Sequence, residues 1–171
     1  MKWRFAGKFL ISFAILIVLW ARSDFGTHYR TAALAAVHAL SPVVNGWQLE
    51  HDQPGAIADI LFRSGNRELP MLLQLPALSM GLVPFVSLVL ATPGQGVKRA
   101  ALNVVLGSGL YFLVHVIVLL AYPLIMDRPN AVKDTLGVFT GLMAFVVAPL
   151  GLWFVLTYPA LRSLWQLSPE K

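Results

Sequence analysis

The sequence predicts an all-α membrane protein, with four transmembrane helices and a small periplasmic α/β-hairpin-like insertion between helices 1 and 2. Of its 171 residues, 57% are hydrophobic and only 12% are charged, whereas a soluble domain carries about 25% charged residues. So few ionised groups could not cover the surface of a soluble protein of this length. The apolar residues also lie in long uninterrupted runs, which is the pattern of membrane spans. We therefore expect a single membrane domain over residues 1–171.

The four spans are expected at residues 5–21, 69–92, 100–125 and 135–157. The first run follows a basic N-terminus, as in a secretory signal peptide. Cleavage after Ala21 would place Leu19 where a small residue is preferred, so the sequence favours an uncleaved anchor. In the second span Pro70 suits a first helical turn, whereas Pro76 and Pro84 fall inside the helix and predict kinks. The fourth span ends near aromatic residues typical of the membrane interface, namely Trp153, Tyr158 and Trp165.

Residues 22–68 are too polar to span a membrane and form the predicted periplasmic segment. Within it, residues 31–40 are rich in alanine and leucine and predict a helix that ends at Pro42. Trp47, Leu49 and His51 then alternate with polar residues, the period of a strand. Residues 52–55 read Asp-Gln-Pro-Gly and predict a turn. Residues 56–63 fit either the returning strand or a short helix, and the sequence leaves both open.

The distribution of basic residues predicts the orientation. With both termini in the cytoplasm, seven Lys and Arg residues lie inside and six outside. Three of the seven (Lys2, Arg4 and Lys8) precede the first span, whose flanking charge usually dominates the topology. We therefore expect a multi-pass protein of a bacterial inner membrane with both termini cytoplasmic. The net charge of +5 is explained by lipid headgroups and topology, not by nucleic-acid binding.

A polar stripe lies in the third span, where Asn103, Gly107, Tyr111 and His115 are spaced by four residues and Ser108 lies beside them. Ionisable residues at membrane depth are functional candidates, so a proton relay or ligand contact facing the bundle interior is one interpretation. Hydrogen bonding between helices, with Gly107 and Gly109 allowing close approach, is the favoured one.

The other residue patterns that resemble catalytic or metal sites fit those sites poorly. Gly107-Ser108-Gly109 suggests an intramembrane serine protease, but His115 lies two turns away on the same helix. His28, His38 and His51, with Asp24, Asp52 and Asp59, match no compact metal-binding spacing. There is no cysteine, which excludes disulfides and a thiol nucleophile. We expect no catalytic, metal or cofactor site.

Several apolar residues interrupt the polar periplasmic segment: Trp47, Ile57, Ile60, Leu61 and Phe62. Packing within the chain is their favoured use, and a partner surface is the alternative. For a partner surface, the candidate contacts are Trp47, Ile57, Ile60 and Phe62, together with the proline-kinked second span.

The layout resembles a known family. A basic start and a single span ending in Trp20 precede a stretch with Tyr29, Arg30 and an alanine-leucine-rich helix, then a strand-like region and three proline-marked spans. This is similar to the small membrane proteins encoded with exosortases, in particular the exosortase H-associated membrane proteins. The resemblance implies an accessory to a protein-sorting system whose integral-membrane cysteine transpeptidase processes C-terminal signals. Without cysteine, the chain cannot be that transpeptidase.

These observations predict a non-catalytic accessory subunit that binds or positions a larger integral membrane protein. The family resemblance implies that this partner is the sorting transpeptidase. The alternative is a small oligomeric transporter or channel-like protein that uses Asn103, Ser108, Tyr111 and His115 as a polar path. Paired intramembrane charges, which are typical of transporters, are almost absent from the predicted spans.

Overall fold

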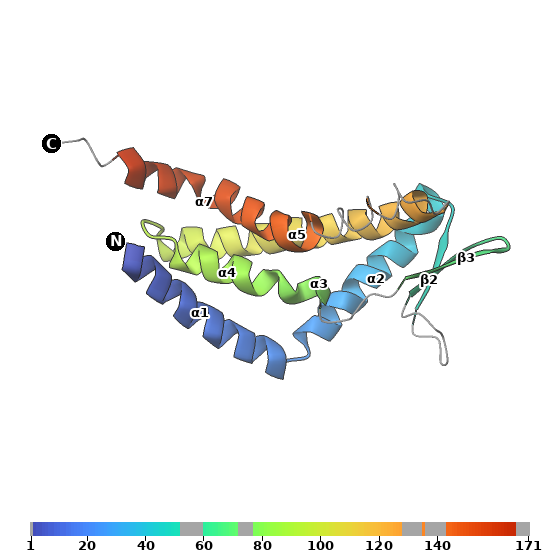
Figure 1. Ribbon diagram of the computed structural model, residues 1–171, viewed down its shortest axis with the longest axis horizontal. Helices are drawn as coiled ribbons and strands as arrows, with labels where there is room; N and C mark the ends of the chain where they lie inside the picture. Colours follow the sequence, from blue (N-terminus) through green and yellow to red (C-terminus); the bar gives the residue numbers. More distant parts are fainter. Residues whose placement is uncertain (1, 52–59, 72–76, 128–134, 136–142, 167–171) are drawn as a thin grey trace.

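The computed structural model describes residues 2–51, 60–71, 77–127, 135 and 143–166. These residues are mostly helical and include one three-stranded sheet (Figure 1). In chain order the elements are α1 (Lys2–Arg22), α2 (Phe25–Val44), β1 (Gln48–His51), β2 (Ile60–Ser64), β3 (Arg67–Met71), α3 (Ala77–Met80), α4 (Leu82–Ala91), α5 (Val97–Met126), the π-helical turn η1 (Met143–Val147) and α7 (Ala148–Gln166).

Helix α5 runs along most of the length of the molecule, and the other elements lie along it (Figure 1). Helices α1, α4 and α7 lie beside its first half, whereas α2 and the sheet lie beside its second half. The start of α1, the loop between α4 and α5, and the end of α7 therefore share one end of the molecule, here called the terminal end. The opposite end, formed by the sheet and the end of α5, is called the sheet end.

Two helices are long and apolar enough to cross a membrane, Trp3–Arg22 in α1 and Val97–Met126 in α5. They coincide with the first and third predicted spans, 5–21 and 100–125. Within the described ranges no other helix meets both conditions, so the prediction of four spans is not confirmed. Helix α5 has 30 residues, or about 45 Å at 1.5 Å per residue, which exceeds a hydrocarbon core of about 30 Å.

The predicted second span, 69–92, does not form one helix. Its first residues belong to strand β3, where Pro70 lies instead of in a helical turn. Helices α3 and α4 follow, separated at Gly81 and only 4 and 10 residues long, so neither alone could cross a bilayer. Pro84 lies inside α4, and Pro76 falls outside the described residues. In the predicted fourth span, residues 136–142 also fall outside the described residues. Helix α7 continues past the predicted end of that span, Thr157, to Gln166.

Helix α2 is longer than the predicted helix at 31–40. It begins at Phe25 and continues through Pro42 to Val44, so the prediction that Pro42 ends it is wrong. Proline at this position removes one backbone donor within the last turn only. The end is completed by the amides of Asn45 and Gly46, which both donate to the Ser41 carbonyl, at 3.0 and 3.1 Å.

The sheet has the order β1-β2-β3, with both pairs antiparallel. Residues 60–63 therefore adopt the returning strand, not the short helix that the sequence left open. The predicted turn at 52–55 lies outside the described residues. The third strand was not predicted. It is joined to β2 by a two-residue turn in which Gly65 has φ of +60°, a conformation that glycine adopts without strain.

Side chains from the helices cover both outer strands of the sheet. His38 Nδ1 lies 2.8 Å from the Leu49 carbonyl in β1, so its N–H donates to that edge. In β3, Pro70 has no N–H, and its carbonyl accepts the Tyr122 hydroxyl at 3.1 Å. Proline and capped carbonyls protect edge strands against pairing with another chain. The sheet therefore packs on α2 and α5, and its outer strands are not arranged to pair with a strand of another chain.

Candidate functional site

The polar side chains in the middle of helix α5 lie on its buried face, together with apolar ones such as Val116 and Leu119. Asn103, Gly107, Tyr111 and His115 are all buried, which places the predicted stripe in the bundle interior. Lys98 and Arg99 are exposed in the first turn of α5. Beyond that turn its exposed large side chains are apolar, namely Leu102, Val105, Leu106, Leu110, Leu113, Ile117 and Leu124. This inversion of the soluble pattern is expected when lipid replaces water around a helix.

The first half of the stripe joins α5 to its neighbours. Asn103 Nδ2 donates to Gln95 Oε1 at 2.8 Å and lies 3.3 Å from the Leu156 carbonyl in α7. One turn further, Gly107 faces the buried ring of Phe85 in α4, and a Cβ atom at Gly107 would overlap that ring. These contacts support the interpretation of the stripe as packing and hydrogen bonding between helices.

The second half of the stripe is an aromatic and imidazole cluster. The Tyr111 hydroxyl lies against Gly81, between α3 and α4, and its ring centroid is 4.3 Å from that of His115. His115 Nδ1 lies 2.8 Å from the hydroxyl of Tyr29 in α2. Burial raises the pKa of Tyr29, so its hydroxyl stays protonated and can donate to the imidazole.

Tyr29 is the partner that sequence reasoning missed. It lies 86 residues from His115, and a lone tyrosine in an alanine-rich helix carries no local signal of such a contact. The pair fixes α2 against the second half of α5. In contrast, Gly109 has open space around it, so it does not support close approach as predicted.

Among the residues that the structure describes, the serine, histidine and aspartate candidates of the sequence do not come together as a catalytic or metal centre. Ser108 and His115 lie on one helix about 10 Å apart along its axis, and Ser108 faces a groove beside α1 while His115 contacts Tyr29. Among the described residues, no three His, Asp or Glu side chains lie together as metal ligands. Asp52 and Asp59 are outside those residues, as is Ile57.

Three of the predicted partner contacts in the segment 22–68 belong to the core. Trp47, Ile60 and Phe62 are 6%, 0% and 0% exposed, and the Phe62 ring lies 5.9 Å from that of Tyr122. Their prediction as a partner surface is therefore wrong, because the sheet packs its apolar face on α2 and α5. The favoured alternative, packing within the chain, is the one observed.

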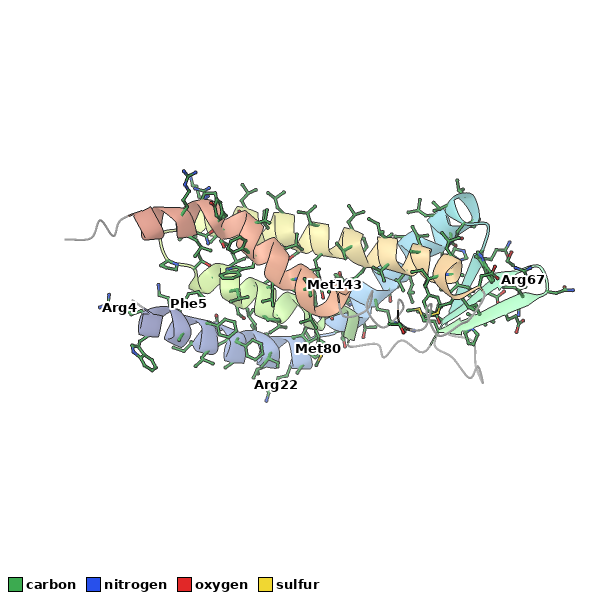
Figure 2. The ribbon with its side chains drawn as sticks, turned by 45° about the horizontal axis from the view of Figure 1, so that its top comes forward. Arg4, Phe5, Arg22, Arg67, Met80 and Met143 are labelled. Carbon is green, nitrogen blue, oxygen red and sulfur yellow. The ribbon has the colours of Figure 1, made fainter. Side chains whose placement is uncertain are left out.

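Two apolar grooves flank α1, which packs along α4. The groove on the α7 side has a cavity volume of about 410 Å³ and includes Phe13, Ile17 and Pro149 in its lining. The groove on the α5 side has about 500 Å³ and includes Leu16, Leu19 and Val104. Trp20 and Val83 line both. Figure 2 shows Met80, which also lines the α7-side groove, beside the part of α1 that leads to Arg22.

The grooves could not be predicted from hydropathy, because an apolar span looks the same whether lipid or another helix covers it. Comparison of the chain with protein-family models, curated proteins and solved structures gives no match.

Proposed function

We propose that this chain is a non-catalytic accessory subunit of a bacterial inner membrane, and that it binds a larger integral membrane protein through the two grooves beside α1. The observation that carries the proposal is the exposure of α1. No residue in its most apolar window is buried, although α1 packs along α4 and Trp20 Nε1 donates to Ser79 Oγ in α3 at 3.0 Å. An apolar helix with a groove on each side can pack against another apolar helix.

The proposed topology has four crossings, made by α1, by α3 with α4, by α5, and by η1 with α7. Its support is the common location of the start of α1 and the end of α7 at the terminal end (Figure 1), since an even number of crossings returns the chain to its starting side. The α3–α4 crossing is short, and Gly81 and Pro84 within it are of the kind tolerated where neighbouring helices supply contacts.

The proposed occupant of the grooves is a transmembrane helix of the partner. Both grooves are lined almost entirely by apolar side chains, so a polar or charged ligand would lose its hydration without compensation. The family resemblance suggests a sorting transpeptidase as that partner, and a chain without cysteine fits the supporting role in such a pair.

The transporter alternative has less support. A polar path requires side chains that face a water-filled cavity. Asn103 and His115 instead already bond to Gln95 and Tyr29, and Phe85 occupies the space beside Gly107. If the stripe is nevertheless a path, His115→Ala should abolish pH-dependent flux in proteoliposomes.

Filling the grooves tests the accessory role. Ile17→Trp and Leu19→Trp each place a larger apolar side chain in one groove, whereas Leu10→Trp and Ile11→Trp alter exposed positions on the same helix that line neither groove. Overpacking a fitted contact costs about 1–3 kcal/mol, so we expect about tenfold less partner with the groove variants. The measurement is the stoichiometry of the co-purified integral membrane protein, by quantitative mass spectrometry after extraction in mild detergent.

The two control variants should retain the partner at the wild-type ratio. Equal retention in all four variants would show that the grooves are not the contact surface. A homogeneous homo-oligomer with no second protein would rule out the accessory role and return attention to His115.

A further inference from the structure

Five cations whose side chains the structure describes are exposed at the terminal end: Arg4, Lys8, Lys98, Arg99 and Arg162. They come from α1, from the first turn of α5 and from the last turns of α7. All described acidic residues (Asp24, Glu50, Glu68 and Asp127) lie elsewhere in the chain, either at the junction of α1 and α2 or at the sheet end. Within the described part of the chain, the five cations therefore form a surface of one charge sign.

Contacts between the elements hold these cations near one another. The Phe5 ring in α1 lies 6.5 Å from the Trp153 ring in α7, and Trp153 Nε1 donates to Thr92 Oγ1 at 2.9 Å, at the end of α4. Asn103 in α5 reaches α7 through the Leu156 carbonyl. The three helices that carry the charges are thus bound to one another within about three turns of those charges.

At the sheet end, in contrast, the arginine side chains form ion pairs with acidic residues. Arg63 lies 2.9 Å from Glu50 and 2.7 Å from Glu68, and the hydrogen bond to Glu68 raises the pKa of Arg63. Arg67 lies 3.0 Å from Asp127. Figure 2 shows Arg4 and Arg67 at opposite ends of the molecule. The chain thus neutralises these cations at one end, whereas at the other the described residues include no acid to do so.

The geometry points to a binding surface for acidic phospholipid headgroups at the terminal end. Guanidinium and ammonium groups recognise phosphate through charge-assisted hydrogen bonds, and long basic side chains at helix ends extend toward the headgroup layer. Trp3, which is 90% exposed beside Arg4, is the kind of side chain that lies at this layer. The surface is therefore matched in both charge and amphipathic character to an acidic lipid leaflet.

This inference rests on the membrane insertion proposed above, but not on the accessory role. The test uses the full-length protein in mild detergent, with phosphatidylglycerol or phosphatidylcholine added, and native mass spectrometry to measure the affinity for each lipid. Two variants remove two cations each, Lys98→Gln with Arg99→Gln at the terminal end and Arg63→Gln with Arg67→Gln at the sheet end.

We expect the wild-type protein to bind phosphatidylglycerol more tightly than phosphatidylcholine, and inorganic phosphate not to displace it. The terminal-end variant should weaken phosphatidylglycerol binding by about fivefold for each cation removed, while the sheet-end variant should match the wild type. Equal affinity for the two lipids, or equal loss in both variants, would overturn the inference. Resistance to alkaline extraction from vesicles tests insertion separately, so a failure of the membrane arrangement can be told apart from a failure of the lipid surface.

Discussion

Replacing Gly107 with leucine is expected to destabilise the helical bundle, whereas the same replacement at Gly109, two residues along α5, is expected to be tolerated. A side chain at Gly107 would overlap the ring of Phe85, which is fully buried. Overpacking of this kind costs about 1–3 kcal/mol. At Gly109 there is open space within 4 Å, and leucine favours helix over glycine by up to about 1 kcal/mol.

The measurement is thermal unfolding in mild detergent, followed by circular dichroism, for wild type and both variants. Gly107→Leu should unfold at a clearly lower temperature and Gly109→Leu at the wild-type temperature or above. A second-site change, Phe85→Ala, should partly restore the Gly107→Leu variant because it vacates the space that the new side chain needs. Similar unfolding temperatures for the two glycine variants would contradict the assigned packing of α4 on α5.

The role of this glycine was accessible from the sequence in part. The spacing of Asn103, Gly107, Tyr111 and His115 predicts one helical face, and the structure buries that face. Which glycine permits close approach depends on the neighbouring helix, so spacing alone could not distinguish Gly107 from Gly109. The side chain that fills the space beside Gly107 is the Phe85 ring, and which side chain lies there depends on tertiary packing.

Strand β3 shows a second limit of sequence reasoning. Pro70 is compatible with the first turn of a helix and equally with an edge strand, and the apolar run that follows favoured the helix. The decisive features are Gly65 in a tight turn and the pairing of Arg63 with Glu68 across it. Once β3 forms, Phe62 lies between two strands and becomes core, which also removes it from the predicted partner surface.

The hydrogen bond between Tyr29 and His115 is expected to help fix α2 on α5, together with the bond from Asn45 Nδ2 to the Leu120 carbonyl at 2.7 Å. Tyr29→Phe removes the hydroxyl but keeps the ring, which packs edge-on against Phe112 with centroids 5.5 Å apart. Loss of a buried hydrogen-bond partner costs about 1–3 kcal/mol. Tyr158→Phe, at an exposed tyrosine in α7, serves as the control and should change stability by less than about 0.5 kcal/mol.

A double-mutant cycle with His115→Leu separates this bond from general packing. The 2.8 Å contact indicates that the two side chains interact. The double variant should then be more stable than the sum of the two single effects predicts. For polar pairs in membrane proteins this coupling free energy is about 0.6 kcal/mol on average and up to about 1.7 kcal/mol. Amide hydrogen exchange should rise in α2 and stay unchanged in α1, because Ser23 and Asp24 separate the two helices. Additive single effects, or faster exchange in both helices alike, would show that α2 is held by its apolar contacts and that His115 has a different task.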